Sequence, residues 1–276
     1  QGRLAASPLK LTDADVLRFY TFALFAVGGV QRFLDAYSQG VQTAVSSLFA
    51  VNAGELLAFV AIYSVLKAKS DIVVLTRADF AVISVCAMFF LVPERTMPFA
   101  GATIAGVYFW RRRPYNAQLA SAGQLWLAIA LYETWGRVLF KIVSAPVILF
   151  EASVVAKAGQ WIGAGLSLDG IRLYSAKGWF VFIMDGCSSF HNVSLAVLVW
   201  LSLVKLAGAK VRGSTLMALG VGILAIICLN VVRILLMTPS EEAFQFWHGG
   251  SGAIIFSCLT LAAIAVPATI SLRLRG

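Results

Sequence analysis

Charged residues are scarce in this sequence. Only 13% of its 276 residues are Asp, Glu, Lys or Arg, whereas 60% are hydrophobic. Soluble domains usually contain about 25% charged and about 45–50% apolar residues, so this composition excludes an ordinary soluble enzyme. The mean hydropathy is +0.85, and several runs approach the roughly 20 apolar residues that cross a bilayer. We therefore predict an all-α polytopic membrane protein that is surrounded by lipid.

Cysteine and histidine are also rare, with four and two copies. No CxxC pair occurs, and the cysteine spacing fits neither a zinc site nor a disulfide framework. We therefore predict no metal and no cofactor. Cys86, Cys228 and Cys258 lie inside apolar runs, as small core residues do. Only Cys187 lies at a boundary between polar and apolar sequence.

A basic face with interleaved aromatic residues is missing, although the net charge is +9. Such a face is what a nucleic-acid-binding protein would need, so we predict no nucleic-acid partner. The basic residues lie mainly in short loops between apolar runs, which is typical of the cytoplasmic loops of membrane proteins.

Eight apolar runs predict about eight transmembrane helices. The first, from about Val16, is expected to be a membrane helix and not a cleaved signal peptide. The runs cover approximately residues 16–34, 41–66, 80–92, 97–110, 119–140, 190–206, 216–237 and 247–270. The third and fourth surround Pro93 and Pro98 and are short, so a re-entrant pair is an alternative to two spans.

The sequence predicts one integral membrane domain in three parts, a scaffold (1–140), an outer segment (141–184) and a catalytic part (185–276). Within the outer segment, Pro146 and Glu151 interrupt the apolar run at 142–155, which predicts a helix at the outer membrane interface. Alternating residues over 166–184 predict a small β-like hairpin outside the membrane, before the catalytic helix.

The charge distribution predicts the orientation. With both termini in the cytoplasm, most of the 22 basic residues fall on the inner side, as the positive-inside rule requires. In this orientation Cys187, Arg233 and His248 come from three consecutive helices and meet at one outer level. We therefore expect a multi-pass protein whose active site opens on the outer face.

Residues 185–189 read Asp-Gly-Cys-Ser-Ser and open the apolar run at 190–206. The first turn of a helix has unpaired N–H groups and a partial positive charge. A thiol in that environment ionises more easily, and the thiolate is the nucleophile. Cys187 is therefore the candidate nucleophile, and we assign supporting roles to Asp185 and Ser188.

Two later segments supply the partners that an acyl-transfer nucleophile needs. His248 would hold the thiolate as imidazolium and then protonate the leaving amine. Arg233 would stabilise the oxyanion or orient the substrate carbonyl. Asn230 lies one helical turn before Arg233 and is expected to orient it.

A second histidine provides an alternative base. His191 lies four residues after Cys187, on the same predicted helix face. Side chains in that relation stack along the helix and leave little room for a substrate, and a charged imidazole deeper in the membrane is costly. We favour His248 and keep the Cys187–His191 dyad as the alternative.

The order of these motifs resembles the exosortase/archaeosortase family, in which a Cys-Ser motif opens a membrane helix, Asn-x-x-Arg closes the next and His opens the last. The resemblance covers about residues 159–270. It implies an eight-helix cysteine transpeptidase or protease of the cell (inner) membrane, with Cys187, Arg233 and His248 catalytic. The family motif is typically Cys-Ser-Gly, whereas this chain has Ser189 in place of the glycine.

The resemblance also implies the substrates. They are exported proteins with a C-terminal sorting signal, composed of a short motif such as Pro-Glu-Pro, a membrane helix and a basic tail. The enzyme would cleave this signal, and transfer to an acceptor could follow.

A transporter or channel is the competing class. Glu55 and Glu133 lie within apolar runs, and intramembrane acids often mark ion pathways. Against this, the sequence has no inverted repeat and no paired broken helices.

Overall fold

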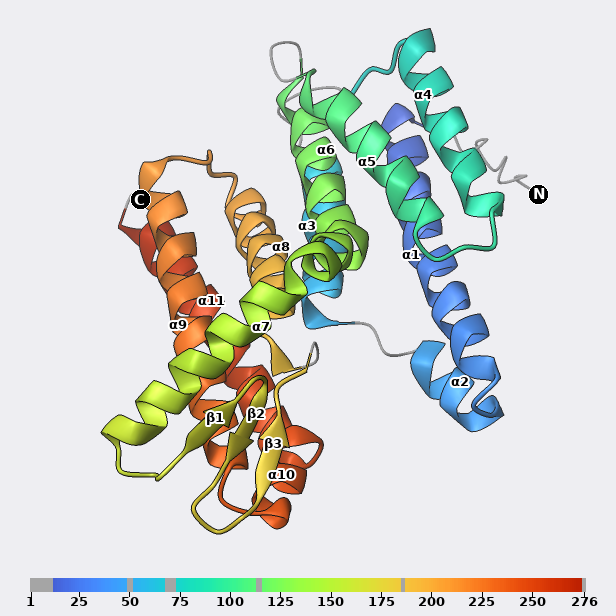
Figure 1. Ribbon diagram of the computed structural model, residues 1–276. Coiled ribbons are helices and arrows are strands. Elements are labelled where there is room, and N and C mark those ends of the chain that lie inside the picture. Colours follow the sequence, from blue (N-terminus) through green and yellow to red (C-terminus); the bar gives the residue numbers. More distant parts are fainter. Residues whose placement is uncertain (1–11, 49–51, 68–72, 113–115, 185–186, 275–276) are drawn as a thin grey trace, which may run out of the picture. The chain divides into compact units, whose positions relative to one another are not determined.

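The computed structural model describes residues 12–48, 52–67, 73–112, 116–184 and 187–274. The described chain is mostly helical with one small sheet (Figure 1), which confirms the predicted helical class and its small β element. The chain divides into two compact units, Gln1–Ala130 and Leu131–Gly276. Each unit is described by itself below, and the three-part division at 140 and 184 stays a prediction.

The described part of the first unit consists of helices joined by short connections. They are α1 (Asp13–Tyr37), α2 (Val41–Leu48), α3 (Ala53–Lys67), α4 (Arg77–Met88), the short turn η1 (Phe89–Leu91), α5 (Met97–Trp110) and α6 (Ala117–Ala130). The run at 97–110 was predicted with the observed bounds of α5. The run at 41–66 was predicted as one helix, but α2 and α3 are separate, and residues 49–51 lie outside the described part.

A buried carboxylate joins α4 to the end of α5. Asp79 is fully buried and accepts hydrogen bonds from Arg112 at 2.7 Å and from Tyr108 at 2.9 Å. It also caps α4 together with Thr76. Burial raises the pKa of Asp79, but the bonds from Arg112, Thr76 and Tyr108 outweigh it and hold this pKa below its ordinary value of 3.8. These contacts fix how α4 packs on α5.

Glu55 is buried near the start of α3 and forms an ion pair of 3.5 Å with Arg32 on α1. Buried charges are normally paired in this way. The ion pair gives Glu55 a structural reason to be buried, whereas from the sequence we had considered it as part of an ion pathway.

The second unit contains the candidate catalytic residues. Its elements are the π-helical turn η2 (Leu131–Trp135), α7 (Gly136–Trp161), β1 (Ser167–Asp169), β2 (Arg172–Tyr174), β3 (Phe180–Phe182), α8 (Phe190–Leu206), α9 (Gly213–Met237), α10 (Glu241–His248) and α11 (Ser251–Arg273). Helices α8, α9 and α11 pack on one another (Figure 1).

Helix α7 differs from the expectation for this part of the chain. We predicted a span that ends near Phe140 and a separate interfacial helix at 142–155. Instead, α7 continues through Lys141, and the irregular turn comes earlier, at η2. Residues 137–145 contain no helix-breaking Gly, and Pro146 is tolerated within the helix, so nothing in the local sequence ends the helix at Phe140.

Three helical stretches of the described chain are long and apolar enough to cross a membrane, namely Ala117–Trp161, Gly213–Met237 and Ser251–Arg273. The apolar helix α8, with 17 residues, has the predicted bounds but is shorter than these. The protein is therefore a multi-pass membrane protein by its apolar helices, and the predicted count of eight spans is not confirmed.

The sheet packs one face against α7. It is antiparallel in the order β1-β2-β3, with Leu173 opposite both Leu168 and Val181. Leu173 and Val181 are buried, while Phe182 is exposed and stacks under Arg172. The small hairpin predicted over residues 166–184 is present as a three-stranded meander, in which the chain also turns around Gly170.

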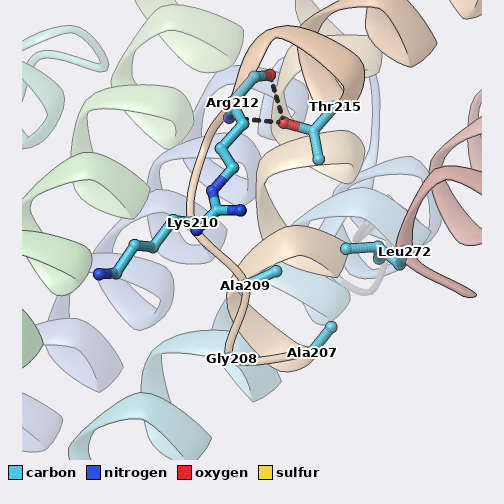
Figure 2. A pocket seen from close by; sticks show the side chains of 7 residues that line it. All are labelled: Ala207, Gly208, Ala209, Lys210, Arg212, Thr215 and Leu272. Atoms are coloured by element: carbon cyan, nitrogen blue, oxygen red, sulfur yellow. Dashed lines mark hydrogen bonds between the residues drawn. The ribbon is translucent and has the colours of Figure 1, made fainter. Parts of the chain in front are cut away.

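A pocket lies in the connection between α8 and α9 (Figure 2). Its volume is about 420 Å³, and its lining residues are Ala207–Lys210, Arg212, Thr215 and Leu272. Arg212 and Thr215 close the start of α9 with two hydrogen bonds of 3.0 and 2.9 Å. Since α8 separates this pocket from Cys187 by roughly 25 Å of helix, it is not part of the candidate catalytic site.

Candidate active site

Cys187 lies three residues before α8 and is nearly buried. Its thiol packs in an apolar cluster with Ile148, Ala152 and Val155 of α7 and Ile234 of α9. Its exposed fraction is 4%. We predicted that Cys187 lies at a boundary between polar and apolar sequence, but its side chain turns toward the apolar cluster.

The backbone of Cys187 is held from α9. The side-chain amide of Asn230 donates a hydrogen bond of 2.7 Å to the Cys187 carbonyl oxygen. Asn230 is itself buried, so the bond is shielded from competing polar groups. We expected Asn230 to orient Arg233, but its amide is directed to Cys187 instead.

Arg233, one turn after Asn230, holds the end of α10. Its Nε donates to the carbonyl oxygen of Trp247 and its Nη2 donates to that of His248, both at 3.1 Å. The last carbonyls of a helix lack intrahelical partners and attract cations. Two of the five N–H groups of the guanidinium are used, which leaves others to meet a substrate oxygen.

His248 is the last residue of α10, not the start of the final helix as we predicted. The chain turns at Gly249 and Gly250, and α11 begins at Ser251. The His248 ring is exposed and stacks on Phe244 with 4.7 Å between ring centroids. Among the described residues, its imidazole forms no hydrogen bond with Cys187.

The alternative base, His191, lies on the first turn of α8. Its ring contacts Tyr132 with centroids 5.1 Å apart. Nearby on the same unit, the buried Glu133 pairs with Arg137 at 3.3 Å. This ion pair accounts for the second intramembrane acid. His191 likewise has no hydrogen bond to the thiol within the described part of the chain.

The serines after Cys187 anchor the segment that leads into α8. Ser188 accepts a bond of 3.3 Å from the Phe190 amide two residues later, as in a serine turn just before α8. Ser189 donates its amide at 3.0 Å and its hydroxyl at 2.5 Å to Oε1 of Glu151 on α7. Asp185, the other predicted supporting residue, lies outside the described residues.

Glu151 was missed as a site residue. The sequence presented it as an acid that interrupts an apolar run, and its partner Ser189 is 38 residues away. The only signal was its position in an otherwise apolar segment, since acids in such places are commonly paired or functional.

The described residues contain no group of three His, Cys, Asp or Glu side chains that could bind a metal ion. One turn of α9 instead binds the backbone carbonyls of Cys187 and His248, through Asn230 and Arg233. The candidate groups are the Cys187 thiol, the Arg233 guanidinium and the His248 imidazole. These are the groups that acyl transfer by a cysteine nucleophile uses.

Comparison with protein families gives one match. The model of the transmembrane exosortase family matches residues 51–265, which is more than three quarters of the chain. The chain belongs to the exosortase family. This confirms the family resemblance found in the motifs and carries with it a general role in processing sorting signals at a membrane. Neither the curated proteins nor the solved structures gave a match.

Proposed function

We propose that this exosortase-family protein is an intramembrane cysteine peptidase or transpeptidase. It cleaves the C-terminal sorting signal of exported proteins, a short motif followed by a membrane helix and a basic tail. Its catalytic residues are Cys187, Arg233 and His248, and its active site faces the outer side of the cell membrane, with both termini in the cytoplasm.

One observation carries the proposal. Asn230 and Arg233 lie one turn apart on α9, and they bind the backbone at Cys187 and at His248 respectively. Three residues of helix rise by only about 4.5 Å. The peptide groups of Cys187 and His248 are thus both bound from the same turn of α9. This supports a shared site for two segments that are far apart in the sequence.

The reaction begins with attack of the Cys187 thiolate on the scissile carbonyl carbon. The new C–S bond places negative charge on the carbonyl oxygen, which the unused N–H groups of Arg233 stabilise. The C–N bond then breaks, and the His248 imidazolium gives its proton to the leaving amine. Water or an acceptor amine cleaves the resulting thioester and releases the thiol.

The apolar cover of the thiol points to how the substrate is admitted. Val147, Phe190, Val231 and Leu235 pack on the cluster around Cys187 and are only partly buried. The membrane helix of the sorting signal is apolar too, and it enters sideways against these side chains. Catalytic contacts then tighten when the substrate is bound, as they often do.

Co-expression with a tailed substrate tests the proposal. Mass spectrometry of the product should show a new C-terminus with the intact protein and none with Cys187→Ala. Cys228→Ala is the matched control, because Cys228 is an exposed cysteine of α9 that is not part of the buried cluster around Cys187. Arg233→Lys should lose about 10²–10³-fold in turnover, since lysine lacks the planar fork. Normal processing by Cys187→Ala would refute the mechanism.

A further inference from the structure

The carboxyl group of Glu151 is an unusual feature of the second unit. Glu151 lies on the apolar helix α7 and is only 9% exposed. Oxygen Oε1 accepts both hydrogen bonds from Ser189. Oxygen Oε2 is buried and has no hydrogen-bond partner among the described residues. Burying a carboxyl group is unfavourable unless it is hydrogen-bonded. Among the described residues, Ser189 provides the hydrogen bonds to this one.

The Glu151 carboxyl and the residues that pack around the Cys187 thiol lie on the same part of α7. Ala152, the neighbour of Glu151, packs in the apolar cluster that contains Cys187, and so does Ile148 one turn earlier. Ser189 follows Cys187 by two residues and directly precedes α8. Glu151 thus holds the chain immediately beyond the thiol.

The segment from Cys187 to Ser189 is held by hydrogen bonds at both ends, an arrangement that we call the clamp. Asn230 of α9 holds the Cys187 carbonyl, and Glu151 of α7 holds the Ser189 amide and hydroxyl. The Ser189 amide is one of the N–H groups at a helix start that need an acceptor, and a carboxyl is favoured there by the helix dipole.

We propose that Glu151 is a positioning residue that fixes the nucleophile Cys187 through Ser189. This inference rests on the proposed function, because Glu151 affects catalysis only if Cys187 is the nucleophile. Its action is geometric, because a carboxylate near a thiol opposes ionisation of the thiol and would not activate it. Reaction rates are sensitive to such positioning, and a displacement of about 1 Å can cost about 10²-fold.

Alkylation of Cys187 by a small neutral thiol reagent tests the clamp without any substrate. In the full-length protein, Glu151→Ala should free the segment and raise the alkylation rate of Cys187 by about tenfold or more. The adduct is assigned by peptide mass mapping. Cys86, which is fully buried in the first unit, is the internal reference and should react at an unchanged rate.

A double-mutant cycle shows whether the effect passes through Ser189. Ser189→Ala removes only the hydroxyl bond and should give a smaller effect than Glu151→Ala. The double variant should equal Glu151→Ala, because Ser189 then has no carboxyl to lose. Glu151→Gln keeps an acceptor oxygen and should restore most of the native behaviour. Ser202→Ala, at a buried serine within α8, is the matched control and should leave the alkylation rate of Cys187 unchanged.

Turnover of a tailed substrate gives the second readout. Glu151→Ala should lower kcat by about 10–10²-fold with little change in KM, because Glu151 positions the nucleophile and does not hold the substrate. Equal rises in the alkylation of Cys187 and Cys86, additive effects in the cycle, or no change at all would overturn the proposal. If the intact protein cleaves no tailed substrate, the proposed function fails, whereas the alkylation cycle still decides the role of Glu151.

Discussion

The side-chain amide of Asn230 on α9 donates a hydrogen bond of 2.7 Å to the backbone carbonyl of Cys187, 43 residues earlier in the chain. One turn further, Arg233 binds the carbonyls at the end of α10. The last part of α9 is therefore the element around which the candidate site is assembled.

Asn230→Ala should weaken both folding and turnover. It leaves the buried Cys187 carbonyl without a donor, which costs roughly 1–3 kcal/mol. The unfolding midpoint in detergent should fall, and turnover measured well below that midpoint should fall as well. Asn192→Ala, at a partly buried position of α8, is the control. Unchanged turnover in Asn230→Ala would show that the bond does not position the nucleophile.

The two histidines can be separated by alanine substitution. His248→Ala should lower turnover by about 10²–10⁴-fold, the range for loss of a general acid or base. Alkylation of Cys187 near neutral pH should slow too, and rising pH should partly restore it as the thiol ionises unaided. His191→Ala should have a mild effect. The reverse pattern would favour the Cys187–His191 dyad.

Gly252→Ala should disturb the corner between α10 and α11. A Cβ added at Gly252 would lie 2.3 Å from the Trp247 ring and 2.9 Å from the Phe246 carbonyl oxygen. Trp247 would have to move, and with it the carbonyl that Arg233 binds. Turnover should fall by about 10-fold or more. Gly220→Ala is the control, since an added Cβ there meets nothing within 4 Å; equal activity of the two variants would contradict this account of the corner.

The Asp79–Arg112 contact predicts a pH dependence of stability in the first unit. The pKa of Asp79 is below its ordinary value in the folded protein. A depressed pKa means that the stabilisation is complete above the unfolded-state value, about pH 4, and is lost as pH falls through the folded-state value. Thermal unfolding from pH 7 down to pH 2 should show this loss in the native protein. Asp79→Asn should be less stable at pH 7 and show a smaller acid loss; the same acid loss in both proteins would assign it to other groups.

Apolar length and motif order predicted much of the second unit. The bounds of α8 at Phe190 and Leu206 follow from a simple apolar run between polar segments. The start of the last helix was wrong because Trp247 is apolar and was read as part of that run. The Gly249-Gly250 pair that ends α10 was the signal that could have corrected this prediction.

Contacts between distant segments could not be predicted in the same way. Glu151 on α7 meets Ser189 38 residues later, beyond the three-stranded meander, and no local pattern contains that pairing. The amide of Asn230 was expected to point along its own helix, but packing of α9 beside the Cys187 segment gave it a carbonyl acceptor instead.

The most direct test of the central claim is the mass of the reaction intermediate. Purified protein is mixed with a tailed substrate, quenched in acid and mapped by mass spectrometry. A thioester between Cys187 and the new C-terminus of the substrate should appear, remain in Cys228→Ala and be absent from Cys187→Ala. An adduct on another residue, or full turnover by Cys187→Ala, would contradict the assignment of Cys187 as the nucleophile.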